Sequence, residues 1–275
     1  MPGAEDQRQD SNSPSSDGSD DASNGSRRAA RLRRRDSASN PLPAGVVVID
    51  KPSGMSSMTA VSIVRRKADL KAGHAGTLDP LATGVLVIGV GRATKSLDRF
   101  MKTRKGYLTE IDLSAFTATD DREAELEPVD VGEPPTDDVI STTLQERFTG
   151  EFMQTPPNFS AKKVQGRRAY ARARKGESPA LEPRPVMVHR IELEDYQWPI
   201  ATVRVCCEKG FYVRSLARDL GRALGTGGHC ASIRRTAVGP FTIEQAVDPD
   251  DLPNEIPPER IIPLSEAIEM LEASP

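Results

Sequence analysis

Residues 74–88 read His74-Ala-Gly-Thr-Leu-Asp-Pro-Leu-Ala-Thr-Gly84-Val-Leu-Val-Ile88, and this stretch decides both the fold and the site. The apolar run Val85–Ile88 predicts a buried strand, whereas the glycines and Pro80 before it predict a loop. A loop that leads into a buried strand can hold one side chain rigidly toward a ligand. Asp79 is the candidate here, although an Asp-Pro pair by itself more often only makes a turn.

Two further motifs flank this stretch, Gly45-Val-Val-Val-Ile-Asp-Lys-Pro-Ser-Gly54 before it and Gly89-Val-Gly-Arg-Ala-Thr-Lys95 after it. Together the three motifs resemble the TruB-type pseudouridine synthase family, whose nucleophile is the Asp of a Gly-His-x-Gly-x-Leu-Asp-Pro-x-Ala-Thr-Gly loop. The resemblance covers roughly residues 44–245. It implies isomerisation of the T-loop uridine of tRNA, U55, to pseudouridine by base flipping. Asp79 would be the nucleophile, and no cofactor would be needed.

The resemblance also implies which residues bind the substrate. Tyr107, in Lys105-Gly-Tyr-Leu-Thr109, matches the aromatic residue that stacks on the target base, although an inward tyrosine on a strand usually belongs to the core. Arg214, in Gly210-Phe-Tyr-Val-Arg-Ser215, matches the arginine that pairs with the catalytic Asp. Tyr212 matches a residue that lines the same pocket.

Further matches are implied at the edges of this site. Ile233 matches an apolar residue under the uracil, and His74 matches a histidine that helps to hold the flipped-out RNA. Lys51 and Pro52 belong to a motif that we interpret as structural support for the Asp79 loop. The segment Thr119-Asp-Asp-Arg-Glu-Ala124 resembles a family loop but lacks its glycine.

Apolar periodicity predicts the remaining elements. We expect strands over 45–50, 84–90, 105–113, 185–194 and 200–208. Helices are expected from Ser56 or Ser57, over 93–101, from 136 or 137 to Gly150, through Leu216, Leu220 and Leu224, and over 264–272. Segment 119–136 should be a loop, and the basic run after Lys162 a helix that ends near Gly176. The mixture predicts an α+β fold around a mixed, largely antiparallel sheet flanked by helices.

Composition divides the chain into three parts. Residues 1–43 are rich in Ser and Asp and contain an arginine cluster at 27–35, so we expect a disordered N-terminal tail. The cluster could contact tRNA phosphates or serve only solubility. Residues 44–248 form the expected catalytic domain. Residues 249–275 form a short Pro-rich C-terminal extension with one helix, and we expect no full RNA-binding domain of the PUA type.

Charge and cysteine content bear on partners and compartment. The formal net charge of -3 argues weakly against a nucleic-acid partner, but basic residues crowd between Lys162 and Lys175, where they could face the T arm of tRNA. The three cysteines have no metal-like spacing, and no segment is apolar enough for a signal peptide or a membrane span. We expect a cytoplasmic monomer with no metal, no membrane contact and no obligate protein partner.

Two other functions fit part of the sequence. A relative that works with guide RNA is one, although the Leu81-Ala-Thr-Gly84 continuation favours the stand-alone form. A catalytically idle RNA-folding factor is the other, and Asp79, Tyr107 and Arg214 argue against idleness. A nucleotide-binding phosphate loop is excluded, because Gly84–Val90 lacks the lysine of that motif. Ordinary glycoside hydrolysis needs a pair of carboxylates, and no motif for a second carboxylate accompanies Asp79. The residues leave open whether Asp79 attacks the ribose or the uracil ring, or permits a glycal intermediate.

Overall fold

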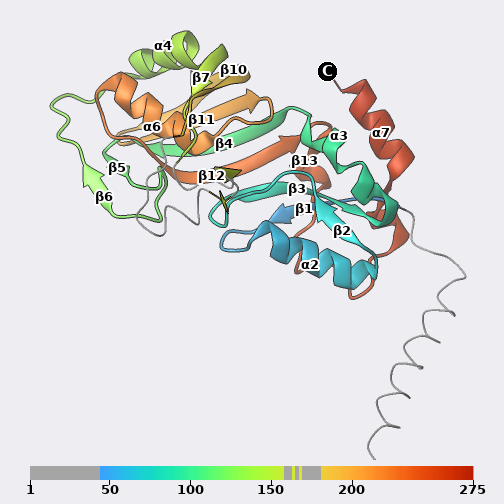
Figure 1. Cartoon of the computed structure of the whole chain (residues 1–275). Helices are drawn as coiled ribbons and strands as arrows, with labels where there is room; N and C mark the ends of the chain where they lie inside the picture. The colour runs from blue at the N-terminus through green and yellow to red at the C-terminus, as the bar shows by residue number, and fades with distance from the viewer. Residues whose placement is uncertain (1–43, 158–162, 165–166, 169–180, 275) are drawn as a thin grey trace, which may run out of the picture. The chain divides into compact units, whose positions relative to one another are not determined.

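A computed structural model describes residues 44–157, 163–164, 167–168 and 181–274 of the chain (Figure 1). These residues form an α+β fold built on one large mixed sheet. Its strands run in the order β14 (Ile262–Pro263), β1 (Gly45–Lys51), β3 (Thr83–Val90), β12 (His229–Val238), β4 (Lys105–Asp112), β11 (Ile200–Cys207), β10 (Arg184–Gln197) and β7 (Gly150–Gln154). The α+β prediction is therefore confirmed.

Short strands extend this sheet or pair apart from it. β2 (Ala72–His74) pairs with β3, and β13 (Phe241–Thr242) pairs with β12. β5 (Ala115–Thr117) pairs with β6 (Leu126–Pro128), and β8 (Lys163–Val164) pairs with β9 (Arg167–Arg168).

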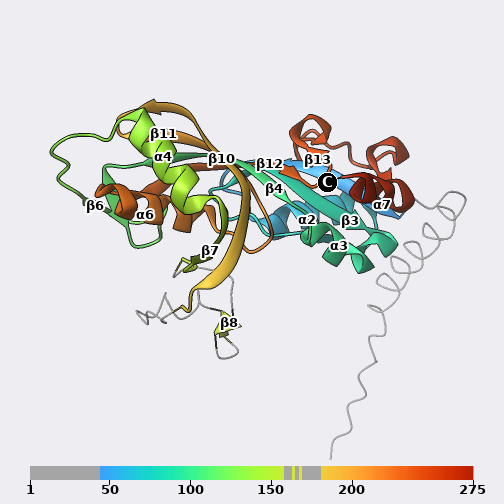
Figure 2. The ribbon, with the colours of Figure 1, turned by 90° about the horizontal axis from the view of Figure 1, so that it is seen from above.

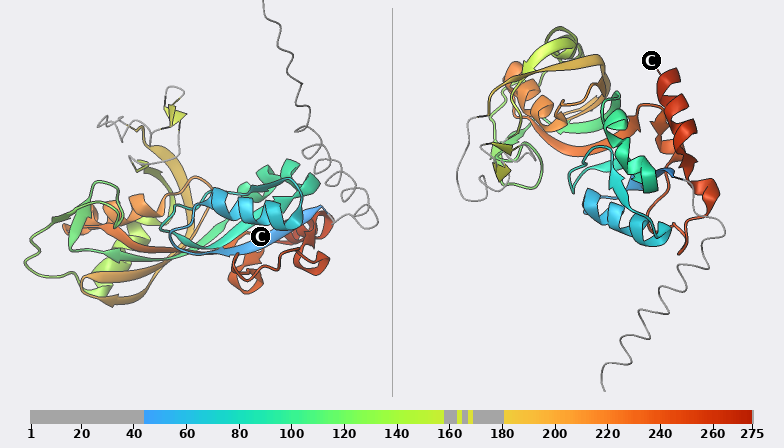
Figure 3. Two further views of the ribbon diagram at one scale, coloured as in Figure 1. Left: turned by 90° about the horizontal axis from the view of Figure 1, so that it is seen from below. Right: turned by 45° about the vertical axis from the view of Figure 1, so that its right-hand side comes forward.

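Helices cover the two halves of the sheet separately, as Figures 2 and 3 show. α4 (Asp137–Phe148) packs on β10, α6 (Val213–Leu224) packs on β12, and the two helices touch each other. In the other half, α2 (Ser57–Ala68) packs on β2 and β3, and α7 (Leu264–Ala273) packs on β1. Between β3 and β4 lie the 3-10 helix η2 (Gly91–Lys95) and α3 (Leu97–Met101). Two more 3-10 turns, η3 (Ile243–Gln245) and η4 (Pro258–Arg260), lie near the C-terminus.

Local sequence explains where the main helices begin and which face they bury. Ser56 caps α2 by accepting a hydrogen bond from the main chain of Thr59, and Thr136 caps α4 in the same way. The buried residues of α4 are Ile140, Leu144 and Phe148, spaced four apart on one face of the helix. Burial of each such apolar side chain contributes about 1.5–3 kcal/mol. The helices are therefore held mainly by the sheet beneath them.

One parallel contact joins the two halves of the sheet. Among the paired strands that the structure describes, β3 and β12 alone run parallel, and they pair through Thr83 with Arg234 and Gly84 with Arg235. Gly84 has φ 100°, and a Cβ atom there would overlap the backbone of Arg235. Glycine is therefore needed at this position for two reasons, its backbone conformation and its close approach.

Several predicted elements differ in the structure. Residues 93–101 form η2 and α3 rather than one helix, and β6 interrupts the loop predicted over 119–136. The basic helix predicted after Lys162 is wrong at 163–164 and 167–168, which are paired strands; its remainder lies outside the described residues, as does the predicted tail. Strand β12 was not predicted, because its apolar residues do not alternate regularly with its polar ones.

Gly84→Ala should lower the free energy of unfolding more than Gly54→Ala does. Both glycines have positive φ, so each substitution brings backbone strain of about 1–2 kcal/mol. At Gly54 a Cβ atom would meet nothing within 4 Å, so its variant isolates this strain, whereas Gly84→Ala adds the clash with Arg235. Urea denaturation of both variants measures the difference, and equal losses would refute the close-approach argument.

Candidate active site

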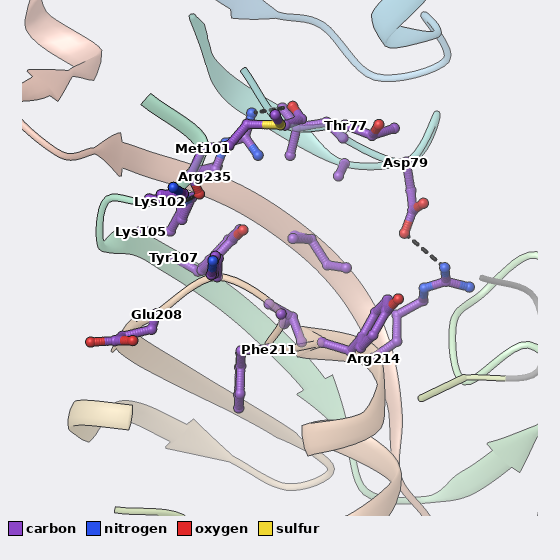
Figure 4. A pocket seen from close by; sticks show the side chains of 18 of the residues that line it. Thr77, Asp79, Met101, Lys102, Lys105, Tyr107, Glu208, Phe211, Arg214 and Arg235 are labelled. Atoms are coloured by element: carbon purple, nitrogen blue, oxygen red, sulfur yellow. Dashed lines mark hydrogen bonds and ion pairs between the residues drawn. The ribbon is translucent and has the colours of Figure 1, made fainter. Parts of the chain in front are cut away.

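A cavity of about 480 Å³ opens where β3 and β12 meet (Figure 4). Its walls come from the loop before β3, from α3 and the residue after it, from β4 and β12, from the first residue of β10, and from the turn that begins α6. Five residues singled out by the sequence line it: Asp79, Tyr107, Tyr212, Arg214 and Ile233. The fold thus brings together side chains that are more than 130 positions apart in the sequence.

The Asp79 loop is anchored on both sides of the aspartate. On one side, Leu78 N donates to Ser57 Oγ at 2.8 Å, and Ser57 Oγ donates to Leu78 O at 2.9 Å. On the other side, Gly54 N donates to Pro80 O at 2.8 Å. These bonds tie the loop to the first turn of α2 and to the segment after β1. The Asp79 side chain itself stays 41% exposed, so the loop is fixed while its carboxylate remains accessible.

Lys51 lies beneath this loop as a buried cation. Its Nζ donates to three main-chain oxygens, those of Pro52 at 2.8 Å, Met55 at 2.7 Å and Pro80 at 3.2 Å. Burial lowers the pKa of Lys51 to about 8, an effect that Asp79 opposes and that Arg235 reinforces. Lys51 therefore crosslinks the segment after β1 to the residue that follows Asp79. Pro52 takes part through its carbonyl oxygen.

Arg214 connects Asp79 to a second carboxylate. Its Nη2 lies 2.9 Å from Asp79 Oδ2, and its Nη1 lies 3.1 Å from Asp121 Oδ2. Nη1 also donates to Thr119 O at 3.2 Å. Arg214 is 6% exposed and Asp121 only 1% exposed, so the second pair is deeply buried. The carboxylate side chains offset the repulsion between an arginine and the positive end of helix α6.

Asp121 was not identified by the sequence as a site residue. It lies in the segment 119–124, which resembles a family loop that normally contains a glycine. Its Oδ1 accepts hydrogen bonds from Thr119 Oγ1 at 2.5 Å and from Glu123 N at 3.0 Å. Because Asp121 is 93 residues from Arg214, no local pattern could show the contact. The local sign of this buried carboxylate in the sequence was the pair of adjacent aspartates, Asp120 and Asp121, in an otherwise exposed segment.

Tyr107 and Arg235 face each other across β4 and β12. Burial raises the pKa of Tyr107, while Arg235 acts in the opposite direction and hydrogen-bonds to its side chain, so the phenol stays neutral near neutral pH. Arg235 is 2% exposed; its Nε donates to Val85 O at 2.7 Å and its Nη2 to Gly76 O at 3.2 Å. Ile233, two positions earlier, is also buried and lines the cavity.

Arg235 and Lys105 were missed by the sequence analysis. Both line the cavity and both are buried. Lys105 Nζ donates to Met101 O at 2.5 Å, and burial lowers its pKa to about 8, with Arg235 acting in the same direction. Figure 4 shows Arg235 and Lys105 beside Tyr107, on the other side of the cavity from Asp79. Arg235 and Lys105 therefore place two cationic groups across the cavity from the Asp79–Arg214 pair.

Tyr212 is held by two residues of the sheet edge. Gln154 Oε1 accepts from Tyr212 N at 2.9 Å, and Gln154 Nε2 donates to Tyr212 O at 3.1 Å. The guanidinium carbon of Arg184 lies 4.7 Å from the centre of the Tyr212 ring. Gln154 and Arg184 are themselves paired across β7 and β10. This sheet edge therefore positions the residue that immediately precedes α6.

His74 is placed apart from the other predicted site residues. It ends β2, opposite Ile88 of β3, and is not among the residues that line the cavity. Its Nδ1 is buried and has no hydrogen-bond partner among the described residues. Burial lowers the pKa of His74, with a contribution from Arg235, so its imidazole is neutral at neutral pH.

The described part of the chain offers no metal centre and no membrane span. Within 44–157, 163–164, 167–168 and 181–274, no group of three or more His, Cys, Asp and Glu side chains could hold a metal ion. In the same part of the chain, no helix is long and apolar enough to cross a membrane. The described cysteines, Cys206, Cys207 and Cys230, are free thiols.

Gln154→Leu should lower the free energy of unfolding by about 2 kcal/mol. The leucine fills a similar volume but leaves two main-chain groups of Tyr212 without their partner, and each buried unpaired group costs about 1–3 kcal/mol. Gln154→Glu keeps an acceptor for Tyr212 N and should lose less. Urea denaturation of both variants gives the values; an unchanged midpoint for the leucine variant would contradict the role assigned to Gln154.

The chain is similar in sequence to proteins of one known family. Residues 63–213 match the model of the TruB family pseudouridylate synthase (N terminal domain), and residues 214–267 match that of the tRNA pseudouridylate synthase B C-terminal domain. The tRNA pseudouridine synthase B of Thermobifida fusca is 45% identical over 236 residues, which are 82% of this chain and 78% of the relative. That of Corynebacterium efficiens is 47% identical over 214 residues, 76% of this chain and 72% of the relative.

A solved structure supports the fold. One chain in a crystal structure of a Cbf5-Nop10-Gar1 complex superposes with a TM-score of 0.64 at 29% identity. The match covers 84% of this chain and 63% of that chain. The similarity therefore extends over most of the sheet and its helices.

Proposed function

Because the chain belongs to the TruB family of pseudouridine synthases, we propose that it isomerises the T-loop uridine of tRNA, U55, with Asp79 as the nucleophile. The enzyme class is isomerase. In this reaction the N1–C1′ glycosidic bond breaks, the uracil turns, and a C5–C1′ bond forms. The proton on C5 is then lost to solvent and N1 takes up a proton, so the composition of the nucleotide is unchanged. Bonds are exchanged within one nucleotide, so the reaction needs no external redox partner.

The observation that carries this proposal is the contact of Asp79 with Arg214 at the cavity. Arg214 binds Oδ2 of the carboxylate at 2.9 Å, and Asp121 binds the arginine from its buried side. The carboxylate is thereby oriented, while the Asp79 side chain lines the cavity and is 41% exposed. Such orientation by a fixed partner is what a nucleophilic carboxylate requires.

The cavity fits a nucleotide that has been turned out of the RNA. Flipping a base costs a few kcal/mol, which contacts inside the pocket must offset. We propose that Tyr107 stacks on the uracil as a neutral phenol and that Ile233 packs against the ring, since both line the cavity. Tyr212 would close the same pocket from the turn before α6.

Three residues of the proposed site act from outside the cavity lining. Lys51 and Pro52 would support the Asp79 loop, as their bonds to the loop and its neighbours suggest. His74 would help to hold the displaced RNA from the end of β2. Its neutral imidazole can accept or donate one hydrogen bond without the cost of a buried charge.

We also propose that the chain acts on tRNA as a cytoplasmic monomer, without guide RNA and without an obligate protein partner. The two relatives described above carry the name tRNA pseudouridine synthase B, which supports tRNA as the substrate. The catalytic domain would span 44–248, with 249–275 as a C-terminal extension. Sedimentation of the purified chain tests the monomer, and activity on bare tRNA tests the need for a guide.

Release of tritium from an unmodified tRNA transcript that carries 5-tritiated uridine tests the activity directly. The C5 proton leaves only when the new carbon–carbon bond forms, so the label reports turnover. A transcript whose T-loop uridine is replaced by cytidine should release no label. Tritium release from that transcript would show that the enzyme modifies a different uridine. No release from any tRNA would favour an RNA-folding role.

Asp79→Asn should abolish turnover while tRNA binding stays nearly unchanged. A loss of at least ten-thousandfold corresponds to about 5 kcal/mol in the barrier. Asp50→Asn is the matched control, because Asp50 pairs with Arg234 at 2.8 Å at the neighbouring β1 strand but does not line the cavity. We expect that control to retain turnover. Substantial tritium release by a folded Asp79→Asn variant would exclude Asp79 as the nucleophile.

Arg214→Lys should retain the fold but lose most of the activity. Lysine keeps the positive charge, yet it cannot span two carboxylates with the planar fork of a guanidinium. We expect kcat to fall at least about a hundredfold, with a smaller change in KM for tRNA. Steady-state kinetics on the transcript measure both constants. Near wild-type kcat would show that charge alone is sufficient at this position.

A further inference from the structure

Asp120 and Arg218 form a second buried ion pair next to the pair of Asp121 with Arg214. Arg218 Nη1 lies 2.8 Å from Asp120 Oδ2, and each side chain is only 10% exposed. Neither residue is among those that line the cavity. This pair can therefore affect the reaction only by positioning other residues.

One face of α6 presents both arginines to one turn of the chain. Arg214 and Arg218 are four residues apart on the helix, so their side chains lie on the same face. They contact two consecutive aspartates, Asp121 and Asp120 respectively. Adjacent side chains of an extended segment point to opposite sides. The turn must therefore depart from extended geometry for both carboxylates to face α6.

The backbone departs from extended geometry at Asp120. Its φ is 60°, in the left-handed region that favours glycine. Its main chain is fixed from two sides, since Asp120 N donates to Thr117 O at 3.2 Å and Cys230 N of β12 donates to Asp120 O at 3.0 Å. Aspartate adopts this conformation more readily than most side chains do, and at this position its carboxylate also pairs with Arg218.

Arg218 is held independently of the cavity. Its Nη2 donates to Thr155 O at 2.8 Å, and its Nε donates to Asp219 Oδ1 at 2.9 Å. Ser215 Oγ also donates to Thr155 O at 2.8 Å. The guanidinium of Arg218 is thus a fixed point that joins α6, the end of β7 and the turn at Asp120.

We propose that Asp120 and Arg218 are positioning residues: the pair fixes the turn that carries Asp121, and Asp121 in turn orients the Arg214 guanidinium toward Asp79. The inference rests on the proposed function of Asp79 and Arg214 and adds two residues that position them from outside the cavity. Without the pair, the turn can relax, Asp121 shifts, and Arg214 loses the orientation that it has in the structure.

Asp120→Gly tests this inference most sharply. Glycine removes the carboxylate and also the backbone strain, so the folded state should be retained. We expect kcat on the tRNA transcript to fall at least about tenfold and KM to stay within about twofold. The fold should be retained, because Arg218 keeps Asp219 as a carboxylate partner at 2.9 Å. A crystal structure of the variant should show the Arg214–Asp79 separation lengthened from 2.9 Å. A variant with wild-type kcat would overturn the proposal.

A double-mutant cycle provides the second test. Asp120→Asn keeps the shape and tolerates positive φ, and Arg218→Gln removes the opposite charge. If the two residues act as one unit, the double variant should lose about as much kcat as either single variant. Independent, multiplying losses would overturn the pairwise role. Glu194→Gln, which breaks the exposed 2.5 Å pair with Arg204, is the control and should leave kcat unchanged.

These outcomes separate the inference from the proposed function. If the wild type is active and Asp79→Asn is not, the proposed function stands whatever the Asp120 and Arg218 variants do. If the wild type releases no tritium from tRNA, the proposed function fails, and the inference about the pair fails with it.

Discussion

Thr83 and Gly84 of β3 pair with Arg234 and Arg235 of β12 in parallel orientation, and this short contact brings the Asp79 loop to the half of the sheet that carries Tyr107, Arg214 and Ile233. It joins two antiparallel halves whose strands otherwise pair with their own neighbours. The Asp79 loop leads directly into β3, Ile233 lies on β12, and Tyr107 lies on β4 opposite Arg235. Because Gly84 has no side chain, the two backbones approach closely enough for the loop to lie above β12. A wider separation of the halves would place Asp79 away from Arg214 at the start of α6.

Charge inside this arrangement is balanced by contacts from several elements rather than by one strong pair. Arg214 interacts with Asp79 and Asp121, and Arg218 interacts with Asp120 and Asp219. Buried ion pairs add little net stability, since desolvation offsets their attraction, but removing one partner leaves an uncompensated charge. Such a network therefore favours one geometry over alternatives more than it stabilises the fold. Asp79 is the member that remains open to the cavity, which is where a substrate can reach it.

The sequence singled out those parts of the candidate site that lie in local motifs. The loop around Asp79 and the start of α6 around Arg214 each carry a recognisable run of residues, and the structure places both at the cavity. Asp121 and Arg235 were missed, because their roles depend on partners 93 and 150 positions away, respectively. Strand β12 was missed for a related reason: its charged residues Arg234 and Arg235 bond to Asp50 and to main-chain oxygens, so its composition does not look like a central strand.

Arg235 illustrates how a charged residue can serve as a core residue of this fold. Its side chain is 2% exposed, yet its guanidinium donates to the carbonyl oxygens of Val85 and Gly76. Those two oxygens lie on either side of the Asp79 loop, so one side chain of β12 holds both ends of the loop. Lys51 makes a similar bridge, because its Nζ donates both to Met55 O in the segment after β1 and to Pro80 O in the loop. The loop therefore depends on two buried cations that bind its main chain, and its single carboxylate, Asp79, is left to pair with Arg214 on the cavity side. This division of roles keeps the loop backbone fixed while the Asp79 side chain stays accessible to a substrate.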